Sequence, residues 1–159
     1  MVTNYVVIFF ISLLCIILEL FFTRILNLKT WNHVVYIIIP FAILGYGVGA
    51  NLYFIFSDWF KKIGKNKIFA LCLLLTAFFS IGSTLALIYF PVGMMNVFKF
   101  FTSLSGPIML SITYGIVILP FIVIGLLVNY LFYQEPSQNY KLYFFDLLGA
   151  GGGRIYFFR

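Results

Sequence analysis

Charged residues are scarce in this 159-residue chain, which has ten lysines and arginines and four acids. They make up 9% of the sequence, whereas a typical soluble domain carries about 25%. Charge is absent from residues 30–57, 68–98 and 100–134, which are stretches of 28, 31 and 35 residues. This distribution excludes a soluble globular domain, a disordered chain and a free nucleic-acid binder.

Cysteine and histidine are also rare, and this limits the chemistry that we expect. Cys15 and Cys72 lie in separate apolar runs, and His33 is the single histidine. A disulfide framework or a metal site needs more such residues at closer spacing. The sequence also has no Ser/His/Asp set, no paired carboxylates and no phosphate-binding loop. We therefore predict no cofactor and no metal, and we expect no catalysis by this chain alone.

The stretches of sequence without charge consist mainly of long apolar runs. Hydrophobic residues account for 64% of the chain, and the mean hydropathy is +1.11. A helix crosses a bilayer with about 20 apolar residues, and these runs are too long and too uniformly apolar for barrel strands. The fold class is therefore predicted to be all-α, a polytopic transmembrane bundle forming one membrane domain over residues 1–159. Its four complete spans are expected at about residues 5–26, 34–57, 68–90 and 108–132, with a partial helix from about residue 141.

Four lysines, which we expect to set the topology, gather in one short connection between the second and third spans: Lys61, Lys62, Lys65 and Lys67. Basic residues favour cytoplasmic loops. An N-terminus in the cytoplasm places five basic residues in inner connections and three in outer ones. We therefore expect a cytoplasmic N-terminus in the inner (plasma) membrane of a prokaryote. The expected partners are the lipid bilayer and either other membrane helices or a second copy, but not nucleic acid.

Glu19 is the most informative single residue, because it lies inside the first span. It is about four residues past the middle, which at 1.5 Å per residue is about 5 Å from the midplane. A carboxylate at that depth costs about 2–3 kcal/mol. Arg24 is five residues further along, about 140° around the helix, so the two do not share a face. With His33 at the start of the second span, they form a candidate intramembrane polar site. Two interpretations stay open, namely an ion, proton or substrate site and a contact that holds helices together.

Glycines in the second span fit two patterns. The letters GYGVGA, from Gly45 to Ala50, match a dinucleotide-binding fingerprint. However, they lie inside an apolar run, without the strand–turn–helix context and the following acid that this motif requires. The same letters place Gly45 and Gly49 four residues apart, a spacing that lets two helix backbones approach closely. We therefore predict helix packing. GAGGGR, from Gly149, also lacks the last glycine of the fingerprint.

Two segments of the chain resemble a known family. LELFFTRIL followed by WNHVVYIIIPFAILGYGVGA resembles the opening of the multi-pass membrane region of spermidine-synthase-like membrane proteins. YFFDLLGAG, from Tyr143 to Gly151, resembles a second element of that region, Tyr-x-x-Asp-Leu-x-Gly-Ala, which opens a later helix and has Asp146 as its acid. The positions that carry the first match are Leu18, Glu19, Thr23, Arg24, Trp31, His33, Gly45, Gly47 and Gly49.

The resemblance implies a membrane module that precedes a soluble, Rossmann-like aminopropyltransferase-type domain. Such a domain would bind decarboxylated S-adenosylmethionine and a polyamine, and it is absent from this sequence. Where an apolar helix is expected after Gly151, the chain reads GGRIYFFR. We therefore expect a truncated, non-catalytic module from a frameshifted or fragmentary gene, with a natural short product as the other explanation. Two other functions stay open: a fragment of a secondary transporter that uses Glu19, Arg24 and His33, and a membrane scaffold subunit.

Overall fold

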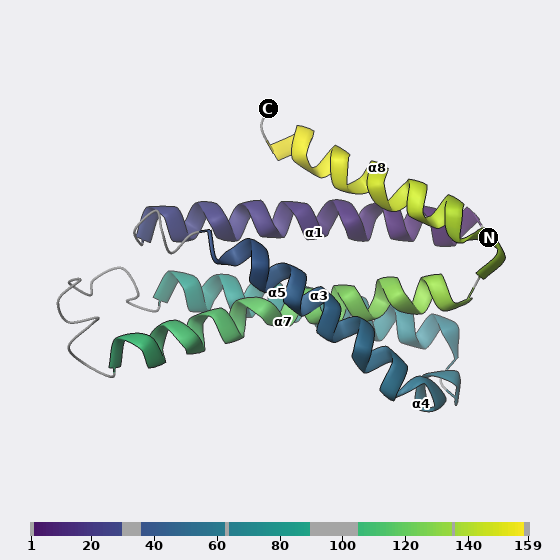
Figure 1. Ribbon diagram of the computed structural model, residues 1–159, viewed down its shortest axis with the longest axis horizontal. Helices are drawn as coiled ribbons and strands as arrows, with labels where there is room; N and C mark the ends of the chain where they lie inside the picture. The colour runs from purple at the N-terminus through teal and green to yellow at the C-terminus, as the bar shows by residue number, and fades with distance from the viewer. Residues whose placement is uncertain (1, 30–35, 63, 90–104, 135, 158–159) are drawn as a thin grey trace.

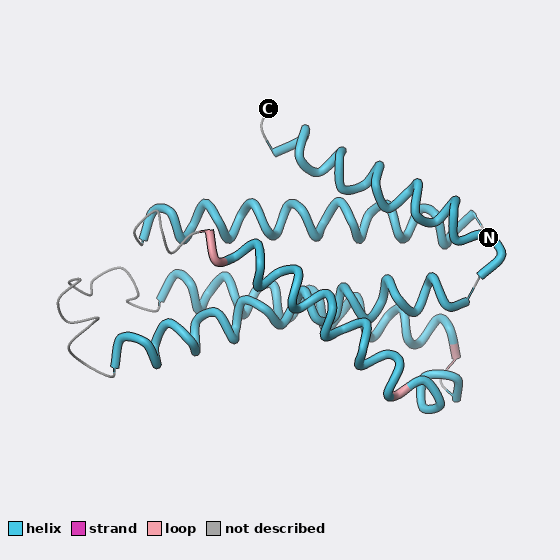
Figure 2. Tube along the Cα trace, viewed as in Figure 1, coloured by secondary structure: helices cyan, strands magenta, loops and turns pink. Residues whose placement is uncertain are grey.

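The computed structural model describes residues 2–29, 36–62, 64–89, 105–134 and 136–157. Every element in these ranges is helical and none is a strand (Figure 2). This confirms the predicted all-α fold class. The elements are α1 (Val2–Lys29), α3 (Ile38–Ile55), α4 (Ser57–Lys62), α5 (Lys65–Tyr89), α7 (Ser105–Gln134), the 3₁₀ turn η2 (Pro136–Gln138) and α8 (Asn139–Phe157).

Four helices in the described ranges, α1, α3, α5 and α7, are long and apolar enough to cross a bilayer, judged by length and composition. Each of them overlaps one of the four spans that the apolar runs predicted. The connection after α3 differs from the simple loop expected there, because residues 57–62 form the short helix α4. Lys65 and Lys67 already belong to the first turn of α5.

The four long helices lie roughly along the long axis of the molecule, and each runs in the direction opposite to that of the long helix before it (Figure 1). α7 is central, because α3 and α5 both pack along it, whereas α1 makes its most extensive contacts with α8. The fully buried side chains of α7 form the middle of the core: Val117, Phe121, Ile124, Leu127 and Leu131. The apolar side chains of α3 and α5 that face away from α7 are exposed in the isolated chain, as expected of surfaces that contact lipid.

Glycines bring α3 and α7 into backbone contact. A Cβ atom added at Gly49 would collide with the carbonyl oxygen of Ile122, and one added at Gly45 would lie 2.9 Å from the Cβ of Phe121. From the other side, a Cβ at Gly125 would collide with the backbone of Tyr46. Only residues without a side chain allow helices to pack this closely.

Pro120 interrupts the hydrogen bonding of α7, and α5 compensates for it. Proline has no N–H, so the carbonyl of Ile116, four residues earlier, loses its helical donor. The buried hydroxyl of Ser83 on α5 donates to this oxygen over 2.8 Å. A backbone carbonyl in hydrocarbon needs a partner inside the protein, and here the neighbouring helix supplies it.

Candidate functional site

The α1–α8 interface contains the second segment of the family resemblance, which packs on the first half of α1. α1 and α8 lie side by side and run in the same direction (Figure 1). A Cβ at Gly149 would collide with the carbonyl oxygen of Phe9, and one at Gly153 would lie 2.9 Å from that of Leu13. Like Gly45 and Gly49, these two glycines are four residues apart and therefore lie on one face of the helix.

Ser12 and Asp146 form a polar contact across this interface. The Ser12 hydroxyl donates to Oδ1 of Asp146 and also lies 2.8 Å from the carbonyl oxygen of Ile8 in its own helix. Ser12 is buried and Asp146 is half-buried. The single hydroxyl proton therefore has two acceptors within reach, and the side chain connects the backbone of α1 with the carboxyl group on α8.

A second polar contact lies near the start of both helices. The Tyr5 hydroxyl donates to Oε1 of Gln138 in η2. The Tyr5 ring stacks on Phe145 of α8, with 5.4 Å between the ring centroids. Tyrosine combines an apolar ring with a polar tip, which suits the end of a span at a membrane surface. The two contacts bind α8 to α1 at two levels.

Ser12 belongs to a small group near the middle of α1. Cys15 and Glu19 follow it at spacings of three and seven residues, so all three lie on one face. Cys15 is close enough to the carboxyl groups of Glu19 and Asp146 to interact electrostatically with both, and Tyr46 of α3 is similarly close to Asp146. We call Ser12, Cys15, Glu19, Tyr46 and Asp146 the central polar cluster.

Glu19 and Arg24 of the predicted intramembrane polar site both lie on α1. Glu19 is half-buried. The Thr23 hydroxyl donates to the Glu19 carbonyl oxygen over 2.7 Å, which is a contact within α1. Arg24 is exposed near the end of this helix. His33 lies outside the described residues.

The described residues contain no group of three His, Cys, Asp or Glu side chains that could hold a metal ion. Cys15 on α1 and Cys72 on α5 are both free thiols. The central polar cluster has two carboxyl groups, but they belong to different helices, and the Asp146 carboxyl is hydrogen-bonded to Ser12. The chemistry that this arrangement supports best is hydrogen bonding between helices.

The four topology-setting lysines flank one short connection. Lys61 and Lys62 close α4, whereas Lys65 and Lys67 open α5 and are exposed. This end of the bundle also holds the start of α1 and the start of α8 (Figure 1). A concentration of lysine at one end is the pattern that the charge rule uses to assign the cytoplasmic side.

Sequence reasoning singled out Asp146 but missed its partner Ser12, as well as the contact between Tyr5 and Gln138. It also missed the packing role of Gly149 and Gly153, although their four-residue spacing was a usable signal. Serine in an apolar helix commonly bonds to its own backbone, so a partner on another helix cannot be deduced without the helix register.

No family model, no curated protein and no solved structure matches this chain. The resemblance to spermidine-synthase-like membrane proteins therefore stays a prediction that rests on the residues quoted above. The structure adds that Leu18 and Glu19 lie on α1 and Asp146 on α8, and that these two helices pack together.

Proposed function

We propose that this chain is a non-catalytic, multi-pass membrane module of a spermidine-synthase-like protein. Its polar residues hold the helices together, and it lies in the inner membrane of a prokaryote with its N-terminus in the cytoplasm. The observation that carries the proposal is the α1–α8 interface. There Asp146 and Gly149 of the second segment contact Ser12 and Phe9 of α1, and the same helix also contains Leu18 and Glu19 of the first segment.

A role in helix packing accounts for the burial of the Ser12 hydroxyl and the Asp146 carboxyl group and for the hydrogen bond between them. In a bilayer, a serine or a carboxyl group without a partner is costly, so a contact between two helices makes both side chains tolerable. The glycines that bring α8 onto α1 point to the same role, because close backbone approach serves packing directly.

The main alternative is a fragment of a secondary transporter, and one observation favours it. Glu19 is a half-buried carboxylate near the middle of α1, and in the described residues its side chain forms no hydrogen bond or ion pair. Ionisable groups at such depths often serve proton or ion pathways. A membrane scaffold subunit is the third candidate, and it shares the packing role proposed here.

The transport alternative is tested in liposomes that contain the purified chain and an internal pH-sensitive dye. Under an imposed membrane potential, we expect proton flux no greater than in empty liposomes, for the wild type and for Glu19→Gln. Flux in the wild type that Glu19→Gln abolishes would contradict the module and support the transporter.

The packing role is tested on the same preparation by unfolding in mixed micelles. We expect Ser12→Ala and Asp146→Leu each to lower the free energy of unfolding by about 0.6–1.7 kcal/mol, the range of interhelical hydrogen bonds in membranes. Thr23→Val is the matched control on α1, because the Thr23 hydroxyl bonds only within its own helix. Stabilities equal to the wild type for both Ser12→Ala and Asp146→Leu would refute the packing role.

The family assignment makes a separate prediction about the gene. The DNA that follows the coding region, read in another frame, should encode further spans and then a glycine-rich, acid-rich soluble domain. Unrelated sequence at that place would remove the support for this assignment, while the packing role of the α1–α8 interface would stand.

A further inference from the structure

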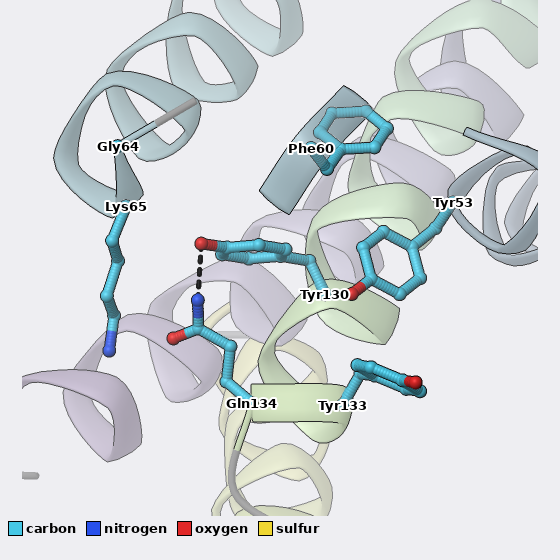
Figure 3. A pocket seen from close by; sticks show the side chains of 7 residues that line it. All are labelled: Tyr53, Phe60, Gly64, Lys65, Tyr130, Tyr133 and Gln134. Carbon is cyan, nitrogen blue, oxygen red and sulfur yellow. Dashed lines mark hydrogen bonds between the residues drawn. The ribbon is translucent and has the colours of Figure 1, made fainter. Parts of the chain in front are cut away.

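A cavity of about 360 Å³ opens where α3 and α7 end and α5 begins (Figure 3). This volume lies at the lower end of the 300–1,000 Å³ that is typical of small-molecule sites. It is separate from the α1–α8 interface and from the central polar cluster. Seven residues line it: Tyr53, Phe60, Gly64, Lys65, Tyr130, Tyr133 and Gln134.

Aromatic side chains form rigid walls around this cavity. The Tyr53 ring contacts two of the others, with 5.7 Å between its centroid and that of Phe60 and 5.8 Å to that of Tyr130. Tyr53, Phe60 and Tyr130 are buried, whereas Tyr133 and Lys65 are exposed. The cavity therefore has an aromatic floor and a mouth that carries the Lys65 ammonium group.

Two polar groups of the cavity, on Tyr130 and Lys65, can donate hydrogen bonds to a ligand. Gln134 donates through Nε2 to the Tyr130 hydroxyl, so the proton of that buried phenol has no acceptor among the described residues. The Lys65 ammonium group brings up to three further donors and forms no ion pair with a described residue. In Figure 3 the Gln134 amide lies between the Tyr130 hydroxyl and Lys65, with its nitrogen toward Tyr130 and its oxygen on the side of Lys65. A ligand that complements the two donor groups brings acceptor oxygens and negative charge.

The cavity lies at the ends of membrane-spanning helices, and this position indicates which anion it binds. Tyr53 is two residues from the end of α3, Lys65 opens α5, and Gln134 closes α7. The ends of spans lie at the level of the lipid headgroups. Phosphate is the anion that concentrates at this depth, and anionic lipids attract lysines near the surface.

We propose that this cavity binds a phosphate ester, with the phosphate held by Lys65 and the Tyr130 hydroxyl and the ester carbons held against Tyr53 and Phe60. The phosphate ester is the headgroup of an anionic phospholipid or a soluble phosphate ester from the adjacent aqueous phase. An organic cation does not fit, because Lys65 would repel it at the mouth.

The test uses the full chain in a neutral detergent and measures binding as the shift in thermal unfolding temperature during titration. The three probes are dioctanoyl phosphatidylglycerol, glycerol 3-phosphate and dioctanoylglycerol, which lacks phosphate. We expect binding of at least one phosphate-bearing probe and none of dioctanoylglycerol. Binding of phosphatidylglycerol alone identifies a lipid as the source, and binding of glycerol 3-phosphate identifies a soluble ester.

Three variants localise the site. Lys65→Gln is expected to weaken binding about tenfold, as for a lost charge-assisted hydrogen bond. Tyr130→Phe, which keeps the ring, is expected to weaken it about threefold to tenfold. Lys67→Gln removes the same charge from the same helix turn at a residue that does not line the cavity, and it should change affinity less than twofold. Equal losses for the two lysine variants, unchanged affinity in Tyr130→Phe, or no binding of either phosphate probe would overturn the proposal.

Discussion

Ser83 on α5 supplies the hydrogen bond that Pro120 removes from α7. A proline inside a spanning helix leaves one carbonyl without a donor, and a serine on a neighbouring span is a polar residue in an apolar setting. The 2.8 Å hydrogen bond from the Ser83 hydroxyl to the Ile116 carbonyl oxygen satisfies both groups. The two residues should therefore be energetically coupled, and this can be measured.

We predict that Ser83→Ala lowers the free energy of unfolding by about 1 kcal/mol. In a Pro120→Ala background the loss should be much smaller, because the substituted alanine restores an N–H that can donate to Ile116. A double-mutant cycle measured by unfolding in mixed micelles gives this coupling. Thr84→Val is the control, because the Thr84 hydroxyl bonds to Ser80 within α5. An equal loss in both backgrounds would show that the two residues act independently.

The glycines of α3 and α8 act on whole helices, because each pair determines how closely two helices approach. Gly45 and Gly49 face α7, and Gly149 and Gly153 face α1. Gly47 and Gly151 lie between these glycines in sequence, but an added Cβ at either would meet open space. This difference gives each helix pair a natural control.

We predict that Gly49→Ala lowers the free energy of unfolding by about 1–3 kcal/mol, the usual cost of overpacking. The new methyl group would force the backbones of α3 and α7 apart. Gly47→Ala should leave stability unchanged or raise it slightly, because alanine is the better helix former. Thermal unfolding of the two variants side by side checks this, and similar losses for both would contradict the packing described for α3.

The sequence predicted the helices better than it predicted their contacts. Four spans could be identified from long apolar runs, three of which exclude charge altogether, and the spacing of Gly45 and Gly49 indicated a packing face. The partner of Ser12, the donor for Ile116 and the cavity around Tyr53 could not be foreseen. Each of these depends on the rotation and register of one helix against another, which apolar composition leaves open because these spans are hydrophobic all round.

At the scale of the whole molecule, the helices pack as two groups. α7 with α3 and α5 forms the larger group, and α1 with α8 forms the other. α8 is not among the helices apolar enough to span, and it carries Asp146 and Arg154. Its attachment to α1 through Ser12 and through glycine packing explains how a helix of this composition is kept in the bundle.

The central claim is that α1, α3, α5 and α7 cross a bilayer in alternating directions. Single cysteines in a Cys15→Ala, Cys72→Ala background, labelled in intact cells with a membrane-impermeant maleimide, test it most directly. The informative positions are Asn66→Cys at the start of α5, Ser137→Cys in η2, Tyr89→Cys at the far end of α5 and Phe78→Cys in its middle.

The account predicts that Tyr89→Cys reacts in intact cells, whereas Asn66→Cys and Ser137→Cys react only after the cells are permeabilised. Phe78 is 70% exposed in the isolated chain, yet Phe78→Cys should stay unlabelled in both conditions because lipid covers it. Labelling of Phe78→Cys by the water-soluble reagent, or reaction of Asn66→Cys and Ser137→Cys from opposite sides, would contradict the account.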